Sequence, residues 1–233
     1  EGRMTVEMTC PFAANTYQGW NFSTVWAAHP TVNGGYPYLQ SQDVAPSGPI
    51  EIGTLGELAA IGVSPCYPLD GDYVLMNDID ASPTSDSSSP FWNGGAGWDP
   101  IGDVSNPFTG TFDGQGFTID NLAAKRSSED FVGLFSRTDG AAVKDLTLTN
   151  FDIEANTRAG GLVADADSTG IENVFVEGTL VSNTFGGGLV GASQGSTYFN
   201  VHSNVDLSTF ATGQLFGGLI GEALGCEISN ASS

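Results

Sequence analysis

Two patterns of apolar residues recur along the second half of the chain at nearly the same interval. The first is a Gly-Leu pair that starts at Gly133, Gly161, Gly188 and Gly218, so successive pairs lie 28, 27 and 30 residues apart. Nine residues after each leucine begins the second pattern, which reads Val143-Lys-Asp-Leu, Ile171-Glu-Asn-Val, Tyr198-Phe-Asn-Val and Ile228-Ser-Asn-Ala in turn. A period in this range is typical of stacked repeats, and it predicts a solenoid.

The residues between these patterns predict strands. They are mostly Thr, Ser, Asn, Gly, Asp and Val, which form helices poorly, so a leucine-rich repeat with a helical back is excluded. Apolar side chains also alternate, as at Leu146 and Leu148, with the period of a strand. We therefore predict an all-β fold, a right-handed parallel β-helix in which each repeat forms one coil and adds about 4.8 Å along the axis.

A row of small polar residues runs through the second pattern, namely Asp145, Asn173, Asn200 and Asn230. Each lies between two apolar residues that are expected to point inward. Because Asn and Asp tolerate a left-handed backbone, the row predicts the corners of successive coils. A ladder that binds a ligand is the alternative. The paired glycines are expected to allow sharp corners and a close approach of neighbouring coils.

The first part of the chain predicts a cap and a linker. Residues 1–40 begin with a strand-like segment, Glu1–Val6, and continue with aromatic residues crowded near Gly and Pro. This composition indicates a small closing cap over the end of a core, which is expected to be that of a preceding or neighbouring coil, and a platform for stacking carbohydrate is the alternative. A Pro-containing linker is expected at 41–53, and the β-helix itself at 54–233.

One short capping helix is expected at residues 54–61. Thr54 is a suitable N-cap, and Leu55, Leu58 and Ile61 recur on one face of such a helix. This helix would cover an open end of the β-helix and protect its strand edges.

The charge balance excludes several classes of partner. Six basic residues stand against 27 acidic ones, which gives a net charge of −21. A nucleic-acid binder needs a basic face, so no nucleic acid is expected as a partner, and anionic membranes are excluded on the same ground. No run of residues is apolar enough to insert into a membrane. The acidity suits solubility in salt and calcium binding between carboxylates.

Cysteines and glycosylation motifs are consistent with an extracellular protein. Cys10, Cys66 and Cys226 lie far apart without a C-x-x-C pair, so a zinc site is not expected. In an extracellular chain they would give one disulfide and one free or intermolecular cysteine, with the pairing left open. Asn21 and Asn230 begin N-x-Ser motifs and are candidate glycosylation sites.

No catalytic constellation is evident, and we predict that the chain is not an enzyme. Its two histidines, His29 and His202, lie apart from any recognisable acid, base or nucleophile pattern. Residues 73–80 predict a strand on which Asp78 and Asp80 share one face, where they could meet a calcium ion. No other cofactor is expected.

Several longer motifs resemble those of GLUG-motif proteins. The matching stretches are Tyr73–Asp80, Trp98-Asp-Pro-Ile-Gly102, Phe108–Gly116 and the repeated Gly-Gly-Leu-Val-Gly. The resemblance implies a parallel β-helix from a large bacterial or archaeal surface protein, in many cases an adhesin. Two repeats depart from the pattern. Residues 15–39 resemble the stretch that closes such a domain, yet here they come first.

The two ends of the sequence read as halves of one coil. Joined end to end, Ile228–Ser233 and Glu1–Val6 match Ile171–Val181, with Ile-x-Asn and Glu-Gly in the same relative positions. This match predicts an assembly joint, formed either between subunits by β-strand addition or within one tandem-repeat chain. The joint residues are Glu1, Gly2, Arg3, Met4, Thr5, Val6, Ile228, Ser229, Asn230, Ala231, Ser232 and Ser233. The alternative is that the two ends are unrelated.

Together these patterns predict an extracellular structural or adhesive fibre module that associates head to tail into a filament. The alternative is a monomeric surface adhesin that binds a glycan or protein of a host or neighbouring cell. A polysaccharide lyase or hydrolase is a third and weaker alternative.

Overall fold

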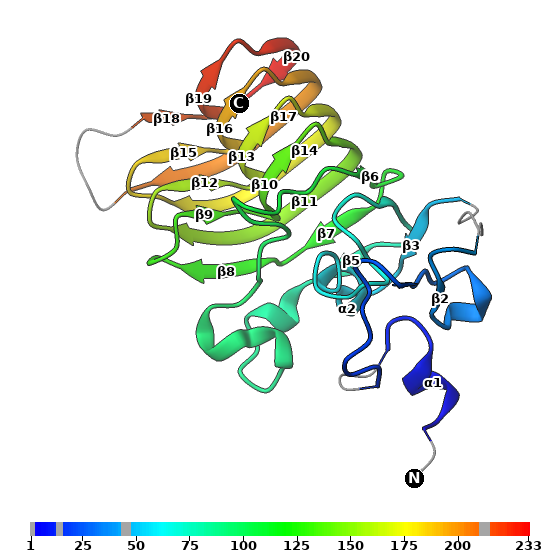
Figure 1. Cartoon of the computed structure of the whole chain (residues 1–233). Coiled ribbons are helices and arrows are strands. Elements are labelled where there is room, and N and C mark those ends of the chain that lie inside the picture. The colour runs from blue at the N-terminus through cyan, green and yellow to red at the C-terminus, as the bar shows by residue number, and fades with distance from the viewer. Residues whose placement is uncertain (1–2, 13–15, 43–47, 210–214) are drawn as a thin grey trace.

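A parallel β-solenoid makes up most of the computed structural model, which describes residues 3–12, 16–42, 48–209 and 215–233 (Figure 1). Its largest sheet has the strand order β20-β17-β14-β11-β6-β4-β3, with β5, β7 and β8 beside this path. The strands are β3 (Ile50–Ile52), β4 (Asp72–Leu75), β5 (Ile79–Asp80), β6 (Thr111–Asp113), β7 (Thr118–Asp120), β8 (Ala123–Arg126), β11 (Ala142–Ala155), β14 (Gly170–Val181), β17 (Thr197–Ser208) and β20 (Glu227–Ser232). Their pairings are parallel, which confirms the predicted fold class.

Two smaller parallel sheets complete the solenoid. One has the order β10-β13-β16-β19 and the other β18-β15-β12-β9. Their strands are β9 (Phe131–Val132), β10 (Phe135–Asp139), β12 (Arg158–Gly160), β13 (Val163–Asp167), β15 (Phe185–Gly187), β16 (Val190–Gln194), β18 (Leu215–Gly217) and β19 (Ile220–Leu224). In chain order, β9–β11, β12–β14, β15–β17 and β18–β20 are therefore four successive coils of the described chain.

The repeat period seen in the sequence becomes a stack of apolar rows. Leu134, Leu162 and Leu189 are all 0% exposed. In the largest sheet Val143 is aligned with Ile171, and Ile171 with Tyr198, one coil further on. Burying a side chain of this size stabilises the fold by about 1.5–3 kcal/mol, so the aligned rows hold neighbouring coils together.

The polar row forms the corners, as predicted, and it also forms a ladder. Asp145, Asn173, Asn200 and Asn230 have φ values of 51°, 53°, 53° and 50°, in the left-handed region. The amide of Asn173 donates to Asp145 Oδ1 (2.7 Å), that of Asn200 to Asn173 Oδ1 (2.9 Å), and that of Asn230 to Asn200 Oδ1 (2.7 Å). Each asparagine amide thus donates a hydrogen bond to the side-chain oxygen of the corner residue one coil earlier.

The glycines of the repeated pair allow the coils to approach closely. A Cβ atom on Gly161 would lie 2.6 Å from Phe151 Cζ and 2.7 Å from the carbonyl oxygen of Gly188 in the next coil. Such distances are shorter than van der Waals contact, so a larger residue would force the coils apart.

The N-terminal end of the solenoid is covered. Helix α2 (Leu55–Ala59) begins after the N-cap Thr54, whose Oγ1 accepts from Glu57 N (3.2 Å) and donates to Glu57 Oε2 (3.0 Å). Leu58 of this helix is 0% exposed, and the apolar face packs into the core. The predicted helix and its cap are therefore confirmed, but the helix ends at Ala59, and Ile61 is buried just beyond it.

An aromatic-rich segment lies beyond this helix. It contains α1 (Thr5–Met8), the 3-10 turn η1 (Asn33–Gly35) and the antiparallel pair of β1 (Trp26–Ala27) and β2 (Tyr38–Leu39). A disulfide between Cys10 and Cys66 ties the segment to the covered end. Two further 3-10 turns, η2 (Ser82–Thr84) and η3 (Pro90–Gly95), occupy the long loop before Trp98.

Three local predictions differ from the structure. Thr5–Met8 is helical, whereas a strand was expected over Glu1–Val6, because Met4 N donates to Glu7 Oε2 (2.8 Å) and closes a helical turn. The strand expected over Tyr73–Asp80 is divided into β4 and β5. Ile50–Ile52, expected in the linker, forms the edge strand β3.

Candidate assembly surface

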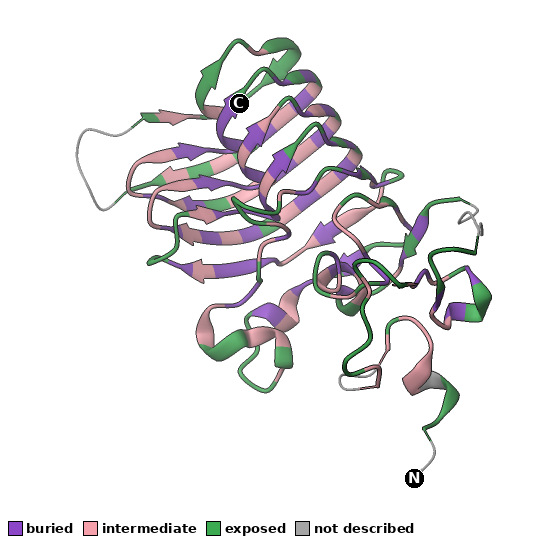
Figure 2. Cartoon of the chain, viewed as in Figure 1, coloured by how far each residue is buried: buried purple, intermediate pink, exposed green. Residues whose placement is uncertain are grey.

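The last coil of the solenoid exposes apolar positions that are buried in every earlier coil. Ile228 is 48% exposed, although Val143, Ile171 and Tyr198 in the same row are at most 1% exposed. Leu219 is half-buried, whereas the equivalent leucines of the earlier coils are fully buried. Figure 2 shows this coil mostly in the colour of exposed residues. We call β18–β20 the terminal coil.

Part of β17, the strand that precedes the terminal coil, has no strand neighbour on its outer side within the described chain. β14 pairs with β17 along its whole length, up to Val181 opposite Ser208. β20 pairs only with the first half of β17, and the register ends at His202 opposite Ser232. Asn204–Ser208 therefore has a strand neighbour on one side alone within the described chain. Accordingly, Leu207 is half-buried, whereas Leu180 directly beneath it is 0% exposed. We call this edge the open half-strand.

The polar ladder is also open at this end. Asn230 donates to Asn200, but no donor in the described chain reaches the Asn230 side-chain oxygen. A further coil with an amide at this corner would continue the ladder in the same direction.

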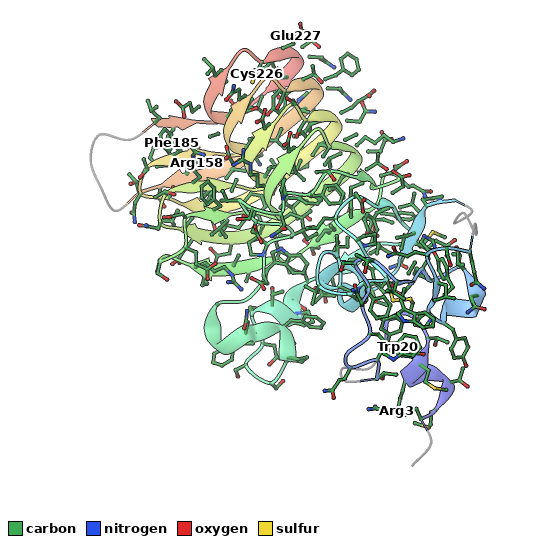
Figure 3. All side chains as sticks on the ribbon, viewed as in Figure 1. Arg3, Trp20, Arg158, Phe185, Cys226 and Glu227 are labelled. Carbon is green, nitrogen blue, oxygen red and sulfur yellow. A yellow bond between two sulfur atoms is a disulfide. The ribbon has the colours of Figure 1, made fainter. Side chains whose placement is uncertain are left out.

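The two halves of the predicted joint lie at opposite ends of the molecule. Arg3, at the N-terminal end, and Glu227, in the terminal coil, are labelled far apart in Figure 3. Met4 is 66% exposed, and Arg3 pairs with Glu7 at 3.7 Å. Val6 lies in α1, and Glu1 and Gly2 lie outside the described residues. The structure thus does not bring the two halves together within one chain.

The C-terminal half of the joint lies in β20. Ile228, Ser229, Asn230, Ala231 and Ser232 are exposed members of that strand, and Ser233 follows it. Every residue of β20 is exposed.

The cysteines divide as one bond and one free thiol. Cys10 and Cys66 are bonded, and Cys226 in the terminal coil is free. The Cys226 thiol donates to Ser193 Oγ (3.3 Å), which also accepts from the hydroxyl of Tyr198 (2.7 Å). Burial raises the pKa of Tyr198 to about 12, so this phenol keeps its proton and remains a donor.

The two candidate glycosylation sites differ in what their amide groups do. Asn21 is exposed, and its Oδ1 accepts from Ser23 and Thr24 in a turn. Asn230 uses its Nδ2 in the ladder. Glycosylation replaces a hydrogen on Nδ2, so the geometry favours Asn21 over Asn230, and occupancy at either position stays a prediction.

The carboxylates considered for calcium have partners within the protein. Asp78 Oδ1 accepts from Thr118 N (2.8 Å). Asp80 accepts from Ser82 and Asn121, and the bond from the Ser82 backbone N–H lowers the pKa of this carboxyl. Among the described residues, no group of three or more His, Cys, Asp or Glu side chains is placed to hold a metal ion.

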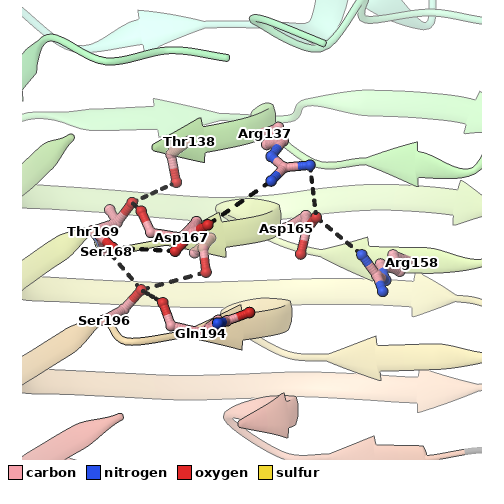
Figure 4. A network of polar contacts seen from close by, with 10 residues as sticks. Arg137, Thr138, Arg158, Asp165, Asp167, Ser168, Thr169, Gln194 and Ser196 are labelled. Atoms are coloured by element: carbon pink, nitrogen blue, oxygen red, sulfur yellow. Dashed lines mark hydrogen bonds and ion pairs between the residues drawn. The ribbon is translucent and has the colours of Figure 1, made fainter. Parts of the chain in front are cut away.

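A polar network joins the outer faces of the two smaller sheets (Figure 4). Asp165 lies 2.9 Å from Arg158 and 3.7 Å from Arg137, and Arg137 also faces Asp167 at 3.9 Å. The Arg158 guanidinium lies between the rings of Phe131 and Phe185, at 5.4 and 5.5 Å from their centroids. These contacts link three successive coils. Apart from the Asp165–Arg158 pair, they join residues 27 or more positions apart, and for that reason they were not predicted from the sequence.

A shallow hollow of about 270 Å³ lies beside this network, and Arg137, Arg158, Asp165, Gln194 and Glu222 are among its lining residues. Arg137 and Arg158 both pair with Asp165 in this hollow, whereas Glu222 forms no ion pair in the described part of the chain.

All six basic side chains of the chain form ion pairs, and they engage nine of the 27 acidic residues in the described ion pairs. Every basic side chain therefore already has an acidic partner within the chain. The surface left over is strongly acidic, so two copies repel each other except where the touching surfaces are uncharged.

Comparisons with known proteins point to large surface proteins. Over 153 residues, 64% of its length, the chain is 40% identical to halomucin of Haloquadratum walsbyi, and it spans 2% of that protein. Over 108 residues, 45% of its length, it is 32% identical to a protein of Evansella cellulosilytica named as a Gly-rich membrane protein, of which it spans 12%. No family model and no solved structure matches the chain. No helix in the described part is long and apolar enough to cross a membrane. The chain is thus a β-solenoid repeat module similar to small parts of much longer proteins.

Proposed function

We propose that the chain is an extracellular structural module, of the GLUG type, which is extended end to end on a cell surface. The observation that carries this proposal is the terminal coil, whose strand edge, apolar row and polar ladder are all left open at the same end. A solenoid gains stability when each coil is covered by a neighbour, so a further coil is the natural occupant. The names of the two similar proteins support a surface location and a role other than catalysis.

The open half-strand fits the N-terminal residues of a second copy. Continued from Ser232 opposite His202, the register places Gly2 opposite Val205 and Met4 opposite Leu207. Met4 would then extend the inward row of Leu180 and Leu207, the row whose outermost member is half-buried. Strand addition of this kind gives main-chain hydrogen bonds and side-chain pockets together.

Charge supports the same register. It places Arg3, one of only six basic residues, opposite the acidic Asp206. Opposite charges aligned across neighbouring strands contribute about 0.2–1 kcal/mol. The helix α1 must unwind to make this strand, and four residues form too short a helix to resist strongly.

The same register holds if a peptide bond joins the two modules. A tandem polypeptide would run from Ser233 into the next Glu1 without a break, and the coil would be completed in cis. Both arrangements produce a linear array, because the joined surfaces are different and do not close on themselves.

A charge reversal tests the joint. Arg3→Glu and Asp206→Arg should each weaken self-association of the purified chain in sedimentation velocity, and the double variant should restore it. Glu7→Gln is the matched control, since it removes the Arg3–Glu7 pair without altering the proposed contact. Deletion of residues 1–6 should abolish association while the circular dichroism of the solenoid is unchanged. Normal association by the deletion variant would refute strand addition.

The second proposal is that the chain acts as a monomeric adhesin instead of an assembling module. The hollow beside Arg137 and Asp165 is the place where a polar glycan would fit. Binding to a glycan array that is lost in Arg137→Ala would support it, and a chain that stays monomeric without glycan binding would refute both functions.

A further inference from the structure

Hydrophobic side chains are exposed at the end of the chain opposite the terminal coil. Trp20 is 40% exposed and Leu39 is 38% exposed. Trp20 packs on Trp26, with ring centroids 4.0 Å apart, and Trp26 is the cross-strand partner of Leu39. The three side chains therefore share one side of the β1–β2 ribbon. We call Trp20, Trp26 and Leu39 the aromatic patch.

The opposite side of the same ribbon is turned toward the protein's own core. Tyr38, which pairs with Ala27, is 9% exposed, and Ala28, which directly follows β1, belongs to the hydrophobic core cluster. The segment is also bonded to the covered end through Cys10 and Cys66. The inner side of the ribbon is thus buried against the protein itself, whereas the outer side, which carries the aromatic patch, is exposed.

The segment around the patch is uncharged. Residues 8–42 contain no Asp, Glu, Lys or Arg, although the chain as a whole has 33 such residues and a net charge of −21. The terminal coil is nearly as neutral, since Glu222 and Glu227 are the charged residues of 215–233. Two copies of so acidic a chain can approach closely only through neutral surfaces, and these two surfaces are at opposite ends.

We infer that the aromatic patch of one copy docks on the terminal coil of a second copy and covers its exposed apolar row. This inference rests on the proposed function, because it supplies the second contact of the same end-to-end joint. The partner is a second copy of this chain, recognised through an uncharged aromatic surface on one side and the row that ends in Ile228 on the other.

The lengths of chain agree with this arrangement. If residues 1–6 lie in the open half-strand of the neighbour, four residues lead from Val6 to Cys10, a span of at most about 14 Å. The disulfide then fixes the aromatic segment, and the helix α2 beneath it, close to the neighbour's terminal coil. The joint is therefore expected to hold neighbouring copies in a fixed orientation, as a flexible linker would not.

Two substitutions on the patch and two matched controls test the inference. Leu39→Glu and Trp20→Glu place a charge in the proposed contact. Val63→Glu and Val104→Glu add the same charge at residues that are 80% and 51% exposed and that belong neither to the aromatic patch nor to the terminal coil. Self-association would be measured by sedimentation equilibrium in about 1 M NaCl, which screens the net repulsion. We expect the patch variants to associate at least tenfold more weakly than the controls, and Leu39→Met to associate normally.

Each result separates the inference from the proposed function. Patch variants that associate like Val104→Glu, while deletion of residues 1–6 abolishes association, would overturn the inference and leave strand addition intact. Weak association of the patch variants with normal association of the deletion variant would support docking and overturn strand addition. A native chain that stays monomeric would overturn both. Intact mass with the Cys10–Cys66 bond present and an unchanged near-ultraviolet circular dichroism spectrum would show that the variants are folded.

Discussion

The two ends of the solenoid differ in whether other residues of the chain cover their apolar rows. At the N-terminal end, α2 and the disulfide-bonded aromatic segment cover the apolar rows, and Leu58 is 0% exposed. At the C-terminal end, the same kinds of row end in Ile228, which is 48% exposed. A bare strand edge invites pairing with another chain, and proteins usually hide it. The apolar rows are thus covered by the chain's own residues at the N-terminal end, whereas at the terminal coil they stay exposed within the described chain.

The largest expected difference between covered and uncovered coils concerns the leucine row. Leu162→Ala, in an interior coil, should lower the free energy of unfolding by about 2–5 kcal/mol because it leaves a cavity among buried residues. Leu219→Ala in the terminal coil should cost about 1 kcal/mol, since this leucine is only half-buried. Urea denaturation of the isolated chain measures both. Equal costs would mean that the terminal coil is as well packed as the interior.

The polar ladder offers the next largest contrast. Asn173→Ala should cost about 2–3 kcal/mol, because it places alanine at φ 53° and removes two ladder hydrogen bonds. Asn173→Gly keeps the left-handed backbone, so the cost that remains in this variant belongs to the hydrogen bonds. Asn230→Gly breaks one bond and should cost about 1 kcal/mol. A ladder without energetic value would show no difference between the two glycine variants.

The covered end depends on its helix cap. Thr54→Ala removes the side-chain oxygen that accepts from Glu57 N, and it should lower stability by about 1 kcal/mol in thermal or urea unfolding. Thr54→Ser keeps the acceptor and serves as the control. No loss in the alanine variant would contradict a role for this cap in closing the N-terminal end.

The smallest effect is a pH dependence of the aromatic segment. His29 is buried, and burial lowers the pKa of its imidazole below the ordinary value of about 6.5. The folded segment therefore prefers neutral His29. Its contribution to stability is complete above about pH 6.5 and is lost as the pH falls through the lower folded value. Limited proteolysis of the segment should speed up between pH 7 and pH 5, and His29→Gln should flatten this dependence. Identical pH profiles for both proteins would refute this assignment.

Regular features of the fold were predictable from the sequence. Each of three features follows from residues that are close together in the sequence. They are the Gly-Leu period, the corner row from Asp145 to Asn230, and the helix after Thr54. The structure has all three where the pattern placed them.

Other features depend on contacts between distant residues and could not be read from local patterns. Glu1–Val6 has the composition of a strand, but Glu7 closes a helical turn on Met4 when no neighbouring strand is present. The position of Arg158 between Phe131 and Phe185 requires the register of three coils. The open half-strand likewise depends on the pairing of β20 with β17, which ends at Ser232.

The central claim is that the terminal coil is completed by a following module. Negative-stain electron microscopy of native material, combined with intact mass under denaturing conditions, tests it most directly. The account predicts filaments whose thickness is that of one solenoid. A denatured mass near 24.1 kDa would mean separate subunits, and a multiple of it one tandem polypeptide or covalent cross-links. Isolated single particles at every salt concentration would contradict the account.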